Sequence, residues 1–228
     1  MIEEDLKNWV PRQRPTNQPI FGQYINIAPY DHQTHPNQLW DAFGGLDANE
    51  LIYHFGWPQM QSAEDLGRII NGFNQSGEFV TCIFEDKNSG KAIGMASYMR
   101  IDCENGSVET GSIAHGAALS KSRAGTEAHY LMAKHIFDEL GYRRYEWKLN
   151  DPNKASHAAA RRFGFTFEGV FRQHQVKPYG NRDTAWYSML NHEWLVVKSA
   201  FEAWLDPSNF DSEGKQIQSL QEIRGNFS

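Results

Sequence analysis

The sequence predicts an α+β fold, a mixed αβα sandwich whose mostly antiparallel sheet carries helices on both faces. Two patterns predict it. Residues 79–85 and 92–102 alternate with a period of two around a polar turn that ends in Gly90, which is typical of an antiparallel hairpin. From residue 107 to residue 163, strand-like and helix-like segments alternate, which indicates crossover connections and a sheet covered on both faces.

The first twenty residues precede the predicted domain. Pro11, Pro15 and Pro19 oppose regular structure there, so we interpret this segment as an arm laid over the domain. Residues 24–28 alternate and predict a first strand. The chain is therefore divided into an N-terminal arm, 1–20, a domain, 21–194, and a C-terminal helical extension with a tail, 195–228.

Residues 36–75 predict helices with breaks. Ser62, followed by Glu64 and Asp65, marks the clearest helix start, because serine caps free N–H groups and acidic side chains stabilise the positive end of a helix. Residues 107–114 predict a further strand beside the hairpin.

The second half of the chain predicts a helix over residues 126–140, closed by Gly141, and a short strand over 144–149. Asp151 and Pro152 predict the N-cap and first turn of another helix. The remaining predicted elements are that helix up to Phe163, a hairpin of residues 165–176 and 184–191, and a last helix, 192–204.

Composition argues against several classes of protein. The formal net charge of −6 argues against a nucleic acid as the main partner, since proteins that bind nucleic acids usually carry a basic face. Cys82 and Cys103 are too few for a disulfide framework, and the histidines lack metal-ligand spacing. The chain shows neither a signal-peptide pattern nor an apolar run of the roughly 18 residues that span a membrane. We therefore expect a cytoplasmic protein with no metal and with neither nucleic-acid nor membrane partners.

A polar loop of small residues, 116–125, leads from a predicted strand into a helix. The first turn of a helix offers unpaired backbone N–H groups and a positive dipole end, so it can bind a pyrophosphate. Gly125 permits a close backbone approach, and Lys121 and Arg123 add positive charge. Many strand–loop–helix units bind nothing, so this loop alone does not identify a site.

Roughly residues 20–215 resemble a known family, the GCN5-related N-acetyltransferases (GNAT), and the motifs that carry the resemblance lie in residues 145–194. Within it they are most similar to the RimJ/RimL-like branch, and there to the uncharacterised bacterial and fungal members with a C-terminal extension. The motifs that carry the resemblance are YEWK at 145–148, Asn153 with Ser156, RRFGF at 161–165, EGVFRQH at 168–174, NRDTAWYSML at 181–190 and EW at 193–194.

The resemblance implies the GNAT fold, in which the fourth and fifth strands splay apart and acetyl-CoA binds between them. It implies that the pyrophosphate lies on the loop and helix start, the pantetheine arm lies along the fourth strand, and the thioester lies near Asn153 and Ser156. The residues it assigns to the cofactor are Ser112, Ile113, Ala114, Ser120, Lys121, Ser122, Arg123, Ala124, Gly125, Thr126, Asn153 and Ser156.

The loop departs from the family pattern Gln/Arg-x-x-Gly-x-Gly/Ala. Ser120 stands at the first position and Arg123 at the first glycine, while Gly125 keeps the last. We therefore expect a reshaped loop that uses side chains as well as the backbone to hold the cofactor.

The candidate catalytic residues are Ser156, as acid or hydrogen-bond donor to the leaving thiolate, His174 as general base, and Glu109 as the alternative base acting through water. Each also has a structural interpretation. Ser156 can hydrogen-bond within its own helix start, His174 can be a half-buried strand residue, and Glu109 can pair with a neighbouring strand. We interpret the charges around the second hairpin as structural ion pairs: Arg172, Arg182 and Asp183.

The sequence thus predicts an enzyme that transfers acetyl from acetyl-CoA to a primary amine, either a protein N-terminus or a small molecule, by direct attack in a ternary complex. The alternative is a non-catalytic acyl-CoA sensor or interaction module on the same fold. The acidic net charge slightly favours a cationic acceptor. Phe201, Trp204 and Leu205 on the last helix can pack on the domain or on a second subunit, which leaves a monomer and a homodimer both open.

Overall fold

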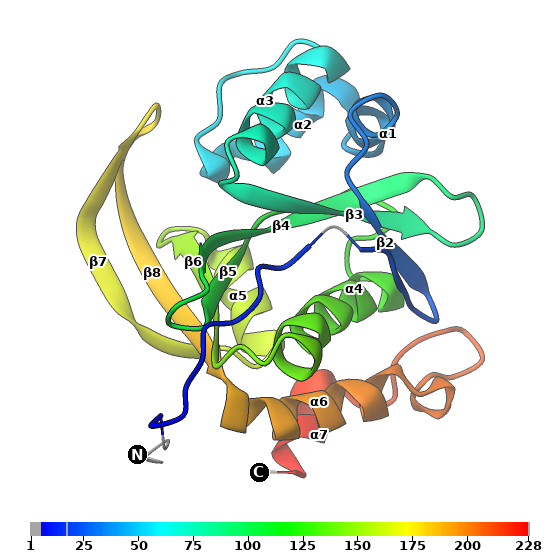
Figure 1. Cartoon of the computed structure of the whole chain (residues 1–228). Coiled ribbons are helices and arrows are strands. Elements are labelled where there is room, and N and C mark those ends of the chain that lie inside the picture. Colours follow the sequence, from blue (N-terminus) through cyan, green and yellow to red (C-terminus); the bar gives the residue numbers. More distant parts are fainter. Residues whose placement is uncertain (1–5, 17, 228) are drawn as a thin grey trace.

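The computed structural model describes residues 6–16 and 18–227, so residues 1–5 and 17 of the predicted arm and Ser228 of the predicted tail lie outside it. A single eight-stranded sheet forms the centre, in the order β1-β2-β3-β4-β5-β6-β8-β7 (Figure 1). Neighbouring strands are antiparallel except β5 and β6, which are parallel. The strands are β1 Ile20–Phe21, β2 Ile25–Pro29, β3 Phe79–Asp86, β4 Ala92–Asp102, β5 Ser107–His115, β6 Arg144–Asn150, β7 Thr166–Lys177 and β8 Gly180–Leu190.

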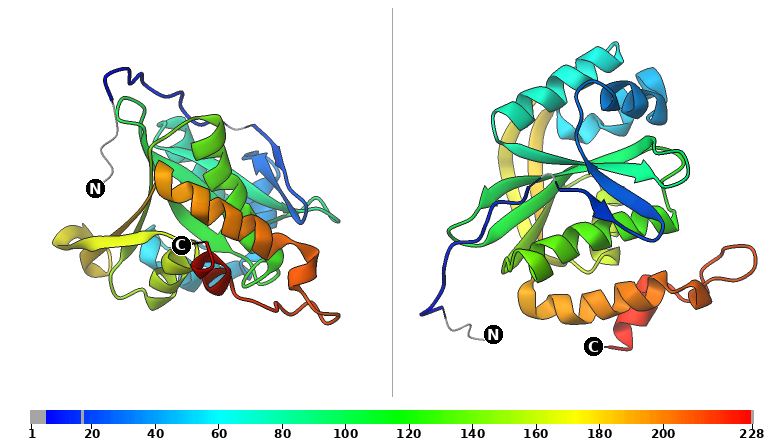
Figure 2. Two further views of the ribbon diagram at one scale, coloured as in Figure 1. Left: turned by 90° about the horizontal axis from the view of Figure 1, so that it is seen from below. Right: turned by 45° about the vertical axis from the view of Figure 1, so that its right-hand side comes forward.

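Helices cover both faces of this sheet, as predicted (Figures 1 and 2). One buried apolar cluster lies under the first three helices and another under the last four, so the sheet separates two layers of core. On one face lie α1 His35–Ala42, α2 Ala48–Leu51 and α3 Ala63–Gln75; on the other lie α4 Arg123–Lys134, α5 Lys154–Arg162, α6 Asn191–Leu205 and α7 Leu220–Gly225. Short helical turns are η1 Gly45–Asp47, η2 Tyr53–Phe55, the π-helical η3 His135–Glu139 and η4 Pro207–Asn209.

The strands β5 and β6 diverge after a short paired stretch. They pair only where residues 107–110 face residues 144–147. Immediately beyond, Ser112 adopts a φ of 48° where the register between β4 and β5 shifts, which is a β-bulge that re-aims the strand. This is the splay that the sequence predicts for the fourth and fifth strands, which are β5 and β6 in the present labelling.

Two helix starts border the wedge between these strands. α4 begins at Arg123, earlier than predicted, because Ser122 caps it with its Oγ 2.9 Å from the Gly125 N–H. The prediction of Asp151 as the cap of α5 was wrong. Asn153 caps that helix instead, because residues 150–153 close a turn that contains Pro152 before the helix begins. The predicted cap Ser62 of α3 is confirmed by its bond to the Asp65 N–H.

The C-terminal helices pack on the domain. Phe201, Trp204 and Leu205 are all buried within the chain, which decides between the two sequence interpretations of this helix. Arg224 of α7 donates to the carbonyls of Arg161 and Arg162 at the end of α5. The extension therefore supports the helix that follows the splayed strands.

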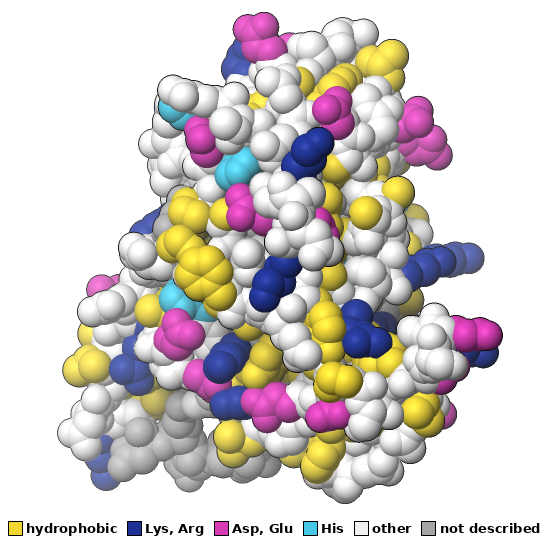
Figure 3. Space-filling view, turned by 90° about the vertical axis from the view of Figure 1, so that its right-hand side faces the viewer, with side chains coloured by type: hydrophobic (Ala, Val, Ile, Leu, Met, Phe, Trp, Pro, Cys, Tyr) yellow, Lys and Arg dark blue, Asp and Glu magenta, His cyan; other side chains and the backbone are white. Residues whose placement is uncertain are grey.

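The described part of the arm contacts the turn between β4 and β5. The Arg12 N–H donates to the Cys103 carbonyl, and the Trp9 indole donates to the Glu104 carbonyl. Both cysteines are free thiols. On the face in Figure 3, the basic and acidic side chains among the described residues are interspersed, so this face carries no basic stripe.

Candidate functional site

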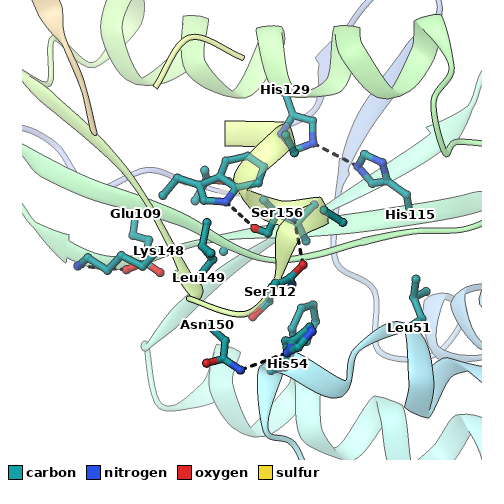
Figure 4. A pocket seen from close by; sticks show the side chains of 18 of the residues that line it. Leu51, His54, Glu109, Ser112, His115, His129, Lys148, Leu149, Asn150 and Ser156 are labelled. Carbon is teal, nitrogen blue, oxygen red and sulfur yellow. Dashed lines mark hydrogen bonds and ion pairs between the residues drawn. The ribbon is translucent and has the colours of Figure 1, made fainter. Parts of the chain in front are cut away.

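A cavity of about 1110 Å³ occupies the wedge between β5 and β6 (Figure 4). It extends from the start of α4, past the unpaired ends of β5 and β6, to the hairpin β7–β8 and to the aromatic side chains that follow η2. Nine of the twelve residues that the sequence assigns to the cofactor line it: Ser112, Ile113, Ser120, Lys121, Ser122, Gly125, Thr126, Asn153 and Ser156.

The start of α4 forms one end of the cavity. The Ser122 Oγ accepts from the Gly125 N–H and donates to the Leu119 carbonyl, which fixes the loop against the helix. A Cβ at residue 125 would lie 2.6 Å from that carbonyl oxygen, so only glycine fits. The first-turn N–H groups and the dipole then face a volume large enough for a phosphate.

A positive charge that the sequence analysis missed lies beside this helix start. Arg162 of α5 lines the cavity, donates to the Thr126 Oγ1 at 3.1 Å and packs 5.0 Å from the Trp204 ring centroid. It forms no ion pair with any described residue, and its burial lowers the pKa of the guanidinium. A half-buried cation that pairs with no carboxylate fits an anionic ligand such as a pyrophosphate.

Arg123, the residue that replaces the usual glycine, does not line the cavity. Its guanidinium stacks 3.4 Å from the Phe210 ring centroid and donates to the Tyr24 hydroxyl at 3.2 Å. The expected mobile charge is therefore a structural contact between the loop and the C-terminal extension. The side chains of Ala114 and Ala124 likewise do not line the cavity.

Ser156 lies at the cavity wall on the first turn of α5 (Figure 4). The Trp147 indole N–H donates to its Oγ at 2.9 Å, while its backbone N–H is bound by the side chain of Asn153. Because the Oγ accepts from Trp147, the hydroxyl proton points elsewhere and remains available to a ligand. Within the described residues no acceptor takes it.

Glu109 lies deep in the same cavity, on the paired part of β5. It is 3% exposed, and its carboxylate accepts from Arg100 at 2.7 Å and lies 3.2 Å from the Lys148 Nζ. Lys148 also pairs with Glu146 at 2.7 Å. Burial raises the pKa of Glu109, and the two cations oppose that rise. Glu109 thus pairs with side chains of the two neighbouring strands, as its structural interpretation predicts, and it also faces the cavity.

His174 is not brought to the cavity by the described structure. It is exposed on β7, and its Nδ1 lies 2.9 Å from the Thr184 Oγ1. Its ring contacts Phe171 and Trp186 on the same hairpin. The predicted ion-pair set around this hairpin is also absent from the described residues: Asp183 accepts from Gln173 and Asn181, and Arg182 bonds to other groups.

Three histidines at the cavity escaped the sequence analysis. His115 at the end of β5 and His129 on α4 face each other with their Nε2 atoms 3.2 Å apart. Burial lowers the pKa of His115 to about 4 and lowers that of His129 well below its usual value. The third histidine, His54 of η2, places its Nδ1 3.3 Å from the Nδ2 of Asn150. The Oδ1 of Asn150 is buried and has no hydrogen-bond partner among the described residues. The two members of each contact are 14 or more positions apart in the sequence, so no short sequence motif contains both of them.

The described residues hold no group of three or more His, Cys, Asp or Glu side chains placed to bind a metal. Among the described helices, none combines the length and apolar character needed to cross a bilayer.

Comparison with known proteins identifies the fold and the family. The acetyltransferase (GNAT) domain family matches residues 37–166. A GCN5-related N-acetyltransferase from Brucella melitensis is similar at 41% identity, with a TM-score of 0.92 over 96% of this chain and 100% of that one. A probable GNAT-family acetyltransferase from Chromobacterium violaceum is similar at 33% identity, with a TM-score of 0.77 over 84% and 96%.

More distant structures share the fold. One is the microcin C7 self-immunity acetyltransferase in complex with acetyl-CoA and AMP, at 21% identity, a TM-score of 0.62, and coverage of 74% of this chain and 93% of that one. No curated protein sequence matches the chain. The matched domain and the two nearer relatives establish that this chain belongs to the GNAT family and is an acetyltransferase.

Proposed function

We propose that this enzyme transfers acetyl from acetyl-CoA to a primary amine by direct attack in a ternary complex. The observation that carries the proposal is the continuous cavity between the splayed strands, which joins an anion-binding helix start to a buried carboxylate. A single cavity of this form can hold a nucleotide thioester and an amine in line, which supplies much of the rate in such reactions.

The donor's phosphates fit the start of α4, where the loop 120–126 meets Arg162. The pantetheine arm fits the free backbone edge of β5 at Ser112 and Ile113, beyond the point where pairing with β6 stops. A backbone N–H at the bulge is positioned by the fold rather than by the ligand, so it suits a developing oxyanion.

The proton transfers use two residues at the other end. The amine must lose a proton before attack, and Glu109 takes it through water, since its raised pKa brings a carboxylate closer to the useful range. The new N–C bond forms as the C–S bond breaks. Ser156 donates a hydrogen bond from its free hydroxyl to the departing sulfur and so stabilises the thiolate. We prefer Glu109 to His174 as the base because only Glu109 faces the cavity.

Two finer assignments remain, the branch of the family and the location in the cell. RRFGF at 161–165 and NRDTAWYSML at 181–190 support the RimJ/RimL-like branch with a C-terminal extension. The free thiols Cys82 and Cys103 support a cytoplasmic location, because reducing compartments keep cysteines unpaired.

Calorimetry with acetyl-CoA, followed by a thiol-release assay over a panel of amines, tests the proposal. We expect binding of acetyl-CoA and release of free CoA only when an amine is present. Binding without amine-dependent release would support the acyl-CoA sensor instead. No binding at all would contradict both readings of the cavity.

A further inference from the structure

The hairpin β7–β8 brings two cations to the end of the cavity that lies away from α4. Gln175 and Lys177 are two residues apart on β7, and Arg182 on β8 is the register partner of Gln175. Because alternate residues of a strand share a face, all three side chains point into the cavity. Val176, between the first two, is 93% exposed on the opposite face.

Neither cation is neutralised by the described residues. The Lys177 ammonium has no ion pair or hydrogen bond among them. Arg182 donates to the Thr184 Oγ1 at 3.2 Å and to the His54 carbonyl at 3.3 Å, both uncharged acceptors. Burial, Arg182 and Arg100 together lower the pKa of Lys177, which is the response of a cation held near other cations.

The carboxylates at this end do not cancel that charge. Glu109 is already bound by Arg100 and Lys148. Glu78 also lines the cavity but is exposed, and its Oε1 lies 3.2 Å from the Ser76 Oγ. The net positive charge therefore faces the ligand.

An aromatic wall adjoins the two cations. Phe73 and Phe79 stack with ring centroids 4.2 Å apart, and Trp57 stacks on Phe73 at 5.8 Å. The hairpin reaches this wall directly, since a Cβ on Gly56, next to Trp57, would lie 2.9 Å from the Lys177 Cδ. The wall lines the same cavity and offers an apolar surface.

We propose that the acceptor is a primary amine that also carries an anionic oxygen group, a carboxylate or a phosphate, bound by Lys177 and Arg182, with an apolar or aromatic body on the wall of Trp57, Phe73 and Phe79. This inference rests on the proposed function of the cavity. It replaces the weak preference for a cationic acceptor that the net charge of −6 suggests, because charges a few ångströms from a ligand outweigh a screened total charge.

Matched acceptors test the inference in the thiol-release assay. The probes are L-phenylalanine, its carboxamide, phenylethylamine, and the phosphonate analogue of phenylalanine. We expect kcat/KM about tenfold or more higher for the carboxylate or the phosphonate than for the two probes without an anionic group. The ratio between carboxylate and phosphonate identifies the group. Equal or better turnover of the amide would overturn the inference while leaving the acetyltransferase activity intact.

A binding measurement covers the case in which none of these amines is turned over. The probe is 3-phenylpropionate, followed by tryptophan fluorescence, with 3-phenylpropanamide as its neutral counterpart. Lys177→Met and Arg182→Gln should each weaken binding of the carboxylate about tenfold. Lys91→Met, an exposed lysine outside the cavity, should leave it unchanged. Unchanged affinity in both cavity variants, or no binding to the wild type, would refute the site.

Two further results keep the proposals separate. If acetyl-CoA itself fails to bind, the proposed function fails. If malonyl-CoA is preferred to acetyl-CoA and Lys177→Met removes that preference, the anionic group belongs to the donor, which would overturn the assignment to the acceptor.

Discussion

The pair His115 and His129 should make the fold sensitive to mild acid. Their Nε2 atoms are 3.2 Å apart, so one ring donates and the other accepts, and the two rings cannot both be protonated. Burial lowers the pKa of His115 from 6.5 to about 4. As the pH falls below 6.5, the unfolded chain therefore binds a proton that the folded chain refuses.

The magnitude follows from that difference. The gap between 6.5 and about 4 corresponds to about 3 kcal/mol of folding free energy, lost progressively as the pH falls from 6.5 to about 4. Between pH 8 and pH 5 the loss from His115 alone is about 2 kcal/mol. Above pH 6.5 both states are neutral at this residue and the effect vanishes.

Urea unfolding at pH 8 and at pH 5 measures this loss. His115→Gln keeps a donor for His129 and removes the titrating ring, so the variant should lose about 2 kcal/mol less than the wild type over that interval. His192→Gln removes an exposed histidine and should behave as the wild type. If His115→Gln shows the same pH dependence as the wild type, the ring of His115 is not held neutral and the reasoning fails.

Three predictions concern the site. Ser156→Ala should lower kcat about 10- to 100-fold with little change in the dissociation constant of acetyl-CoA, and unchanged turnover would remove Ser156 from the chemistry. Arg162→Gln should raise the calorimetric dissociation constant of acetyl-CoA about tenfold, whereas the exposed neighbour Arg161→Gln should not; equal effects would contradict a specific phosphate contact. Activity should rise with pH as Glu109 deprotonates through its raised pKa, and Glu109→Gln should be slower and lack that rise; a variant with the full rise would exclude Glu109 as the base.

Much of the architecture follows from local sequence. The polar turn between the strand-like segments 79–85 and 92–102 is enough to specify a hairpin, and Ser62 caps its helix as its type predicts. The cap of α5 was misplaced because Asp151 and Asn153 are both good caps, and the choice depends on a turn that starts at Asn150. Local propensity cannot rank two such neighbours.

The chemistry of the site depended on contacts that cross the chain. Ser156 and Gly125 stand in motifs whose resemblance to the family predicts their place, and both line the cavity. The sequence did not predict which charged side chains at the site are neutralised, because their interaction partners are distant in the sequence. Arg123 stacks on Phe210, 87 positions away by residue number, whereas Arg162 keeps its charge for the cavity.

The sequence by itself therefore determined the class of fold, the order of its main elements and the loop that leads into α4, since these depend on periodicity and on neighbours within a few residues. Only the tertiary structure decided which charges remain unpaired. It placed Lys177 and Arg182 in the cavity, removed Arg123 from it and joined His115 to His129. The physical reason is that hydrogen bonding and desolvation act over a few ångströms in space, regardless of separation along the chain.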